Sequence, residues 1–246
     1  MSYLLEAKYE CLKLLRTPGR LGPLVLFPLV FYGFFGLGTK QGTGQVQMST
    51  YLLGTYGVFG VMGAALMGIG AGVAVERGLG WMQVKRASPM PSGADLLAKV
   101  LASTLLGLTI VSLLLAIGFV WGGVRLDIAD TAALVATLVA GTVPFCALGL
   151  AIGYFASAQS VHAVVNLFYL PMAFCSGLWV PISMLPEFLR DIAPALPAYH
   201  LAQTALLILR QPAAGSIGGH VAALAAFTVV FLGLAWLGHS LDESRS

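Results

Sequence analysis

The residues best suited to chemistry gather in one stretch of the chain, from Glu76 to Lys99. This stretch holds six charged residues, in a chain with only 13 basic and 10 acidic ones: Glu76, Arg77, Lys85, Arg86, Asp95 and Lys99. Uncharged runs flank it, from Tyr51 to Val75 and from Val100 to Val124. About 20 apolar helical residues cross a bilayer core of about 30 Å, so each run can span it. The charged stretch is therefore predicted to be a polar loop between two membrane helices.

The chemistry open to this loop is recognition of a partner rather than catalysis. It begins with Glu76 and Arg77 at a helix end, turns through Gly78 and Gly80, and continues as a short amphipathic helix containing Trp81. A solvated basic loop with one interfacial tryptophan is the plain structural alternative. A short helix between glycine and proline joints suits docking to a partner protein, and this is the interpretation that we favour.

Sequence motifs of known catalytic sites do not occur. The chain has no G-x-x-x-x-G-K-[ST] loop for nucleotides, no H-E-x-x-H metal motif and no G-x-S-x-G nucleophile turn. Its three cysteines and four histidines have no metal-ligand or redox spacing. No two acidic residues share a predicted span, so an intramembrane protease and an ion-coupled carrier are both disfavoured. An enzyme of another kind stays open.

Few polar residues lie at membrane depth. His162 and Asn166 are four residues apart on one predicted span, with Tyr169 and Pro171 beyond them. An amide in hydrocarbon usually pairs with a neighbouring helix, which is the structural interpretation. The functional alternative is that Asn166 and Tyr169 line a substrate path.

Composition defines the elements that must position these residues. Apolar residues make up 58% of the 246 residues and charged residues only 9%, with a mean hydropathy of +0.89. A typical soluble domain is about 25% charged. We therefore predict an all-α polytopic membrane protein that forms one transmembrane domain over residues 1–246.

Six membrane helices are expected. Their approximate ranges are 21–38, 51–75, 98–121, 132–156, 162–179 and 219–239. Residues 1–20 are predicted to form an amphipathic interfacial helix, because leucines and charged residues fall on different sides of it. The charged loop then covers 76–97. Prolines punctuate residues 181–210, where short helices over about 186–193 and 198–209 are expected to be re-entrant or interfacial on the outer side.

Charge distribution predicts the orientation. The two termini and residues 76–99 carry nine lysines and arginines, whereas the opposite side carries four. The positive-inside rule therefore places both termini and the loop in the cytosol and residues 181–210 outside. We expect no cleavable signal peptide, because the first 20 residues contain six charges and no apolar core.

Small residues form a stripe along the second predicted span. Gly60, Ala64, Gly68 and Gly72 recur every four residues, and Glu76 is the next position on the same face. Small residues at this spacing let two helix backbones approach closely. The stripe is predicted to pack helices, either within one subunit or between two subunits.

Three segments, in this order, resemble the membrane subunits of type 2 ATP-binding-cassette (ABC) exporters. They are LRTP at 15–18, ERGLGWMQVKRASPMP at 76–91 and SGLWVPISMLPEFLRDIAPALPAYHLAQ at 176–203. The resemblance covers nearly the whole chain. Trp81-Met82 depart from it, because a more polar pair is expected there.

The resemblance implies a permease subunit with no catalytic activity of its own. It implies a dimer of permease subunits, identical or different, and cytosolic ATPase subunits on separate chains that bind the ATP and magnesium. It implies ATPase coupling through the loop residues, which are Glu76, Arg77, Trp81, Arg86 and Pro89. The expected location is the bacterial inner membrane.

The cargo is expected to be apolar or amphipathic, such as a drug, an antibiotic or a lipid-like molecule, because no charged cluster lies on the path. One alternative is a membrane enzyme or assembly factor with a site in residues 181–210, where His200 and Glu187 are the candidates. A weaker alternative is an ATP-independent channel or scaffold.

Overall fold

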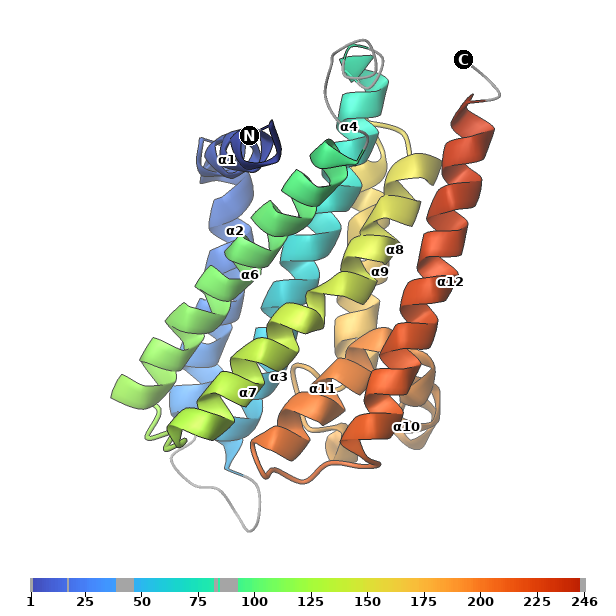
Figure 1. Cartoon of the computed structure of the whole chain (residues 1–246). Helices are drawn as coiled ribbons and strands as arrows, with labels where there is room; N and C mark the ends of the chain where they lie inside the picture. Colours follow the sequence, from blue (N-terminus) through green and yellow to red (C-terminus); the bar gives the residue numbers. More distant parts are fainter. Residues whose placement is uncertain (1, 17, 39–46, 82–83, 85–92, 244–246) are drawn as a thin grey trace.

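The computed structural model describes residues 2–16, 18–38, 47–81, 84 and 93–243. All the secondary structure in these ranges is helical, which confirms the all-α prediction. Figure 1 shows a bundle of long helices with a short helix, α1 (Ser2–Leu15), lying across one end. The C-terminal end of α12 (Ile217–Glu243) lies at the same end of the bundle as α1.

Four helices are long and apolar enough to cross a membrane: Met48–Gly78, Ala94–Val120, Ile128–Phe155 and Ile217–Asp242. Two shorter apolar helices, Gly22–Gly36 and Val161–Cys175, lie where the first and fifth spans are expected, and they run alongside the longer ones (Figure 1). The shorter pair falls below the length of a full span, because about 20 residues are needed.

The helix Met48–Gly78 corresponds to the second predicted span and is called the second long helix below. It contains a π-helical turn that was not predicted from its sequence. α3 (Met48–Ala65) passes into the π-helix η2 (Leu66–Ala71) and then α4 (Gly72–Gly78). π-turns are rare and often lie at functional sites. Here the wider turn holds Gly70 against the backbone of Gly149 in α8 (Thr142–Phe155), and a Cβ on Gly70 would lie 3.0 Å from the Gly149 carbonyl oxygen.

The small-residue stripe of this helix faces α6 (Ala94–Val120). A Cβ on Gly60 would lie 2.5 Å from Ile110, and one on Gly68 would lie 2.3 Å from the Ser103 hydroxyl oxygen. Gly72 follows on the same side, next to the Lys99 side chain, and Ala64 is fully buried. Within one chain, α6 therefore already covers the face that was also considered for contact between subunits.

α6 begins at Ala94, earlier than the expected start near residue 98. Gly93 precedes it with a φ of +85°, a conformation that favours glycine. Asp95 in the first turn favours the start as well, because a carboxylate complements the positive end of the helix dipole. Lys99, at the edge of the predicted 98–121 span, consequently lies further inside a helix that packs along α3.

The proline-rich segment folds into short helices at the end of the bundle opposite α1 and α4 (Figure 1). These are α10 (Glu187–Ile192), the 3-10 turn η4 (Ala193–Ala195) and α11 (Pro197–Ile208). They occupy the positions expected for the outer pieces. α11 packs on α3, on α7 (Ile128–Ala140) and on α12, and is mostly buried.

Candidate functional site

A buried charge network joins three helices at the end of the bundle where α1 lies. Its centre is Lys99 of α6, whose side chain is 2% exposed. The Lys99 ammonium lies 2.8 Å from a Glu76 carboxylate oxygen and 3.3 Å from a Glu10 carboxylate oxygen. It also pairs with Asp95, one helical turn earlier. Glu76 of α4, Glu10 of α1 and Asp95 of α6 thus share one cation.

Lys13 adds a second cation from α1. Its ammonium donates hydrogen bonds to Glu76 and, at 3.4 Å, to Glu10. Partial burial would lower the pKa of Lys13, but the bonds and charges of Glu76 and Glu10 outweigh this and raise the pKa above its ordinary value. Lys13 therefore stays charged at every physiological pH and ties α1 to α4.

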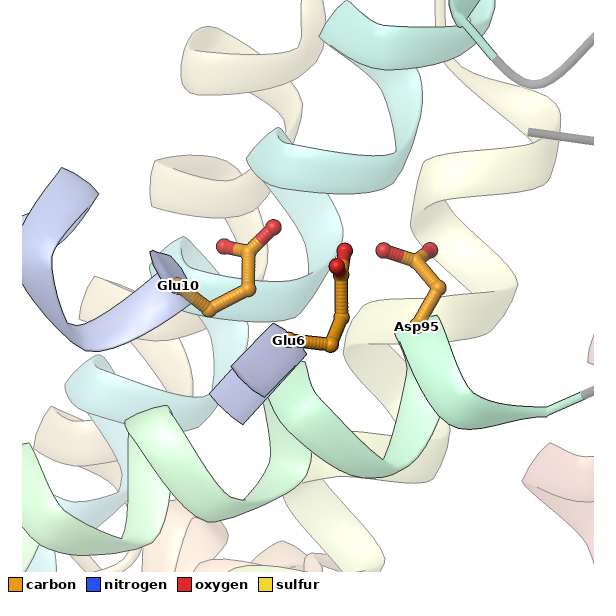
Figure 2. Close-up of side chains that lie close together, drawn as sticks. All are labelled: Glu6, Glu10 and Asp95. Atoms are coloured by element: carbon orange, nitrogen blue, oxygen red, sulfur yellow. The ribbon is translucent and has the colours of Figure 1, made fainter. Parts of the chain in front are cut away.

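Three carboxylates of the network lie close together. Figure 2 shows Glu6 and Glu10 projecting from α1 beside Asp95 of α6, and their oxygens lie within 4.8 Å of one another. Such spacing could hold a metal ion. The Lys99 ammonium, however, already pairs with Glu10 and Asp95. We therefore assign the cluster to an ion-pair network that is built from the chain's own side chains.

Arg77 points to the other side of α4. Its guanidinium donates hydrogen bonds to the backbone carbonyls of Tyr154 and Ala156, the latter at 2.7 Å, and lies 3.5 Å from Asp242 of α12. Tyr154 is in the last turn of α8 and Ala156 is the residue that follows the helix, so no further helical N–H can bond these carbonyls. Adjacent residues Glu76 and Arg77 thus connect α4 to four different helices.

A cavity of about 490 Å³ adjoins the charge network. Its volume falls within the range of about 300–1,000 Å³ that is typical of small-molecule sites. The walls come from α1, α2 (Pro18–Phe31), the second long helix, α6 and α9 (Val161–Cys175), and they are mainly apolar. The lining residues are Glu10, Lys13, Pro23, Leu24, Phe27, Phe59, Met67, Gly68, Gly72, Leu106, His162, Asn166, Tyr169 and Leu170.

Both residues predicted for a substrate path, Asn166 and Tyr169, line this cavity. The Tyr169 hydroxyl donates a 3.1 Å hydrogen bond to the Phe59 carbonyl, and the two rings stack with centroids 4.6 Å apart. Tyr169 therefore fastens α9 to α3 as well as forming a wall. Among the residues that the structure describes, Asn166 has no hydrogen-bond partner, and its side chain is exposed.

The predicted coupling residues separate into two groups. Glu76 and Arg77 are engaged inside the chain, whereas Trp81 is 54% exposed at the end of the bundle. Arg86 and Pro89 lie outside the described residues.

Four residues of the charge network were missed, namely Glu10, Lys13, Asp95 and Lys99. The spacing of Asp95 and Lys99, an acid four residues before a base, is a sequence signal for pairing along a helix. The sequence contains no comparable signal that Glu10 and Lys13 of α1 contact Glu76 and Lys99.

The outer candidates of the alternative enzyme interpretation do not meet in a catalytic arrangement. Glu187 is exposed on α10. His200 instead lies against His220 of α12 and the Pro194 carbonyl, so both of its ring nitrogens have partners.

The fold and this site define a helical membrane protein in which an open, mainly apolar cavity adjoins a charge network at one end of the bundle. The chain belongs to the ABC-2 type transporter family, because residues 3–209 match that family. It is 26% identical over 188 residues to the Bacillus subtilis (strain 168) protein named "Putative transport permease YvfS", and the match covers 76% of each chain. Family membership implies embedding in a membrane, partnership with an ABC ATPase, and a transport role rather than a catalytic one.

Proposed function

We propose that this chain is the permease subunit of an ABC exporter and forms half of the transmembrane pathway. It carries an apolar or amphipathic molecule, such as a drug, an antibiotic or a lipid-like compound, out of the cytosol or the inner leaflet. ATP hydrolysis on a separate ATPase subunit, which holds the ATP and magnesium, drives the movement. A second permease subunit, identical or different, completes the pathway in the bacterial inner membrane.

One observation carries this proposal: the cavity and the charge network share Glu10 and Lys13. The wall of the cavity is thus made in part by the side chains that bond α1 to α4 and α6. Any displacement of α1 or α4 must move these side chains or break their ion pairs. A force applied to α4 by a docked ATPase would therefore reach the cavity directly.

The lining supports the proposed class of cargo. Phe27, Phe59 and Leu24 supply apolar surface, while Asn166 offers an amide that can bond a polar group of the cargo. Glu10 and Lys13 carry charge at one end but already pair with each other, and Lys13 also pairs with Glu76. An amphipathic molecule fits this distribution, with its polar part beside Asn166.

The six spans and the orientation belong to the same proposal. The helices Gly22–Gly36 and Val161–Cys175 would complete six spans with the four long ones. α1, α4 and the end of α12 then face the cytosol, following the positive-inside rule. Trp81 lies on that side and is exposed, so it is a surface for the ATPase.

The test is co-purification with the ATPase subunit, followed by ATP hydrolysis in liposomes with a panel of apolar and amphipathic compounds. Trp81→Ala should weaken co-purification and stimulation by cargo. Trp121→Ala is the matched control, because Trp121 is 69% exposed at the opposite end of α6 and should leave both unchanged. Equal losses in the two variants would refute docking at Trp81.

Asn166→Leu tests the path in the same assay. Loss of one neutral hydrogen bond, about 0.5–1.5 kcal/mol, should raise the half-maximal cargo concentration about 2- to 10-fold. Leu167→Ala is the control, because Leu167 is the next residue on α9 but is not among those that line the cavity. Cargo that stimulates both variants like the unchanged protein would refute the assignment.

A further inference from the structure

Two histidines meet at the end of the bundle opposite the charge network. The Nδ1 atoms of His200 in α11 and His220 in α12 are 2.9 Å apart. The other ring nitrogen of each faces a backbone carbonyl: His200 Nε2 lies 2.9 Å from the Pro194 oxygen, and His220 Nε2 lies 2.7 Å from the Ala214 oxygen. All three distances are those of direct hydrogen bonds.

The number of protons needed for these three bonds exceeds what two neutral rings supply. A neutral imidazole carries one N–H, and a carbonyl oxygen can only accept. If one N–H bridges the two Nδ1 atoms, one carbonyl faces a bare ring nitrogen; the other arrangement uses both N–H groups on the carbonyls of Pro194 and Ala214. Two bare lone pairs would then face each other across the 2.9 Å between the Nδ1 atoms. One additional proton converts that contact into an N–H···N hydrogen bond.

We propose that His200 and His220 form a proton-binding site, in which one shared proton closes a clasp between the outer segment and α12. His220 donates from Nδ1, and the neutral His200 ring accepts. This site is separate from the cavity and from the charge network, and nothing in the proposed transport function requires it.

The surroundings of the pair favour one additional proton and disfavour a second one. Each histidine is the fourth residue of its helix, so both helix N-termini oppose a positive charge. The three hydrogen bonds favour the charge. The pKa of His200 is lowered, first by burial and also by a positive charge on His220, and the hydrogen bond to the Pro194 carbonyl offsets only part of this. A second proton on the pair is therefore disfavoured. A free histidine titrates near pH 6.5, so the pH range that tests this site is centred on neutral pH.

Other titratable groups near the pair are few. The Tyr199 ring lies edge-on to both histidine rings. Asp130 of α7 pairs with Arg210 at 3.0 Å, and the charged side chains of α10, which are Glu187, Arg190 and Asp191, are exposed. The packed faces of α3 and α8 contribute only the neutral side chains Tyr51, Tyr56, Cys146 and Tyr154. The additional charge therefore resides on the histidine pair.

The clasp holds both ends of α11. Pro194 precedes α11, and Ala214 follows it, so the two carbonyls anchor the two loops that flank this helix. Gln203 of α11 also accepts a 2.7 Å hydrogen bond from the Ala214 N–H. Gly215, with a φ of +75°, allows the close approach, because a Cβ there would lie 2.9 Å from His220 Nε2. Loss of the proton removes the bond that joins α11 directly to α12.

A shared metal ion fits the geometry less well. Two imidazole nitrogens that bind one tetrahedral zinc ion at about 2.0–2.1 Å lie roughly 3.3 Å apart. The 2.9 Å separation of the Nδ1 atoms is shorter than this and matches a hydrogen bond. A structural zinc site also needs four ligands, and the pair supplies two.

The experiment measures the thermal midpoint of the full chain in lipid nanodiscs from pH 5 to pH 9. The wild type is compared with His200→Gln, His220→Gln and the double variant. His239→Gln is the matched control, because His239 is on α12 but near its other end. The difference between wild type and either single variant should be largest near neutral pH. It should shrink as pH rises and the shared proton leaves, and shrink again in acid as the second proton enters.

Since the bond needs both rings, the double variant should lose no more pH dependence than either single variant. ¹⁵N NMR of the histidine-labelled chain should detect a third ring proton on the pair, which His220→Gln removes and His239→Gln keeps. Destabilisation that is equal at every pH, or two neutral rings throughout, would overturn the proposal. So would a zinc-dependent rise in the midpoint that both single variants abolish.

Discussion

Lys99→Met is the perturbation that most directly tests how the two long helices and α1 are held together. The Lys99 side chain is 2% exposed, and three carboxylates share its ammonium. Methionine has a similar length and keeps the apolar stem, so the change removes the charge with little loss of packing. Glu76 and Glu10, which are 8% exposed as residues, would then lose their buried partner.

The expected destabilisation follows from this burial. Removing one partner of a buried ion pair costs about 3–5 kcal/mol, because the remaining charge is left without compensation. Lys13 still bonds Glu76 and Glu10, but its side chain is 48% exposed, and a pair at that exposure contributes about 0.2–1 kcal/mol. We therefore expect a loss of about 3 kcal/mol, at the lower end of the range.

The assay is unfolding of the purified chain in mixed micelles, followed by the fluorescence of its four tryptophans. Arg190→Met is the control, since Arg190 is exposed on α10 and should change stability by less than about 0.5 kcal/mol. The double variant Lys99→Met with Glu76→Gln should be less destabilised than the sum of its parts, with a coupling of about 1–3 kcal/mol. A loss below 1 kcal/mol for Lys99→Met, or strict additivity, would refute the network as described.

Two further predictions concern the contacts of the second long helix. Gly149→Ala should destabilise the chain by about 1–3 kcal/mol, because the added Cβ would lie 3.2 Å from the Ala65 carbonyl oxygen. Gly233→Ala is the control and should leave stability unchanged, because a Cβ at Gly233 has nothing within 4 Å. Equal unfolding midpoints for the two variants would contradict this prediction. Arg77→Met should leave the carbonyls of Tyr154 and Ala156 without their donor, at a cost of about 1–3 kcal/mol. Hydrogen exchange should then quicken at the end of α8, and unchanged exchange there would remove the capping role.

The helices of this protein could be predicted because their signal is local. Long uncharged runs, proline and glycine boundaries and the stripe through Gly60 and Gly72 all lie within one segment, and the structure has helices at those positions. The short helices α10 and α11 follow for the same reason, since prolines limit their length.

The charge network and the histidine pair could not be predicted, because they join residues that are far apart in sequence. Lys99 and Glu10 are 89 positions apart, and their contact depends on α1 folding across the bundle. Sequence counting treated Lys99 as a loop charge, since an isolated lysine beside an apolar run usually reaches water. The π-turn at η2 also has no local signal and follows from tight backbone packing against α8.

The placement of Glu76 and Arg77 changes what coupling through this loop must involve. Both were expected to touch the ATPase, yet their side chains bond α1, α6, α8 and α12. Under the proposed function, the partner would need to displace only the exposed surface at Trp81, and Glu76 and Arg77 would transmit that displacement to four helices at once. Because the Glu76 branch shares Glu10 and Lys13 with the cavity wall, cargo in the cavity and the ATPase would act on the same ion pairs. Under the proposed function, such sharing would give reciprocal coupling, in which bound cargo changes the affinity for the ATPase by the same factor as the bound ATPase changes the affinity for cargo.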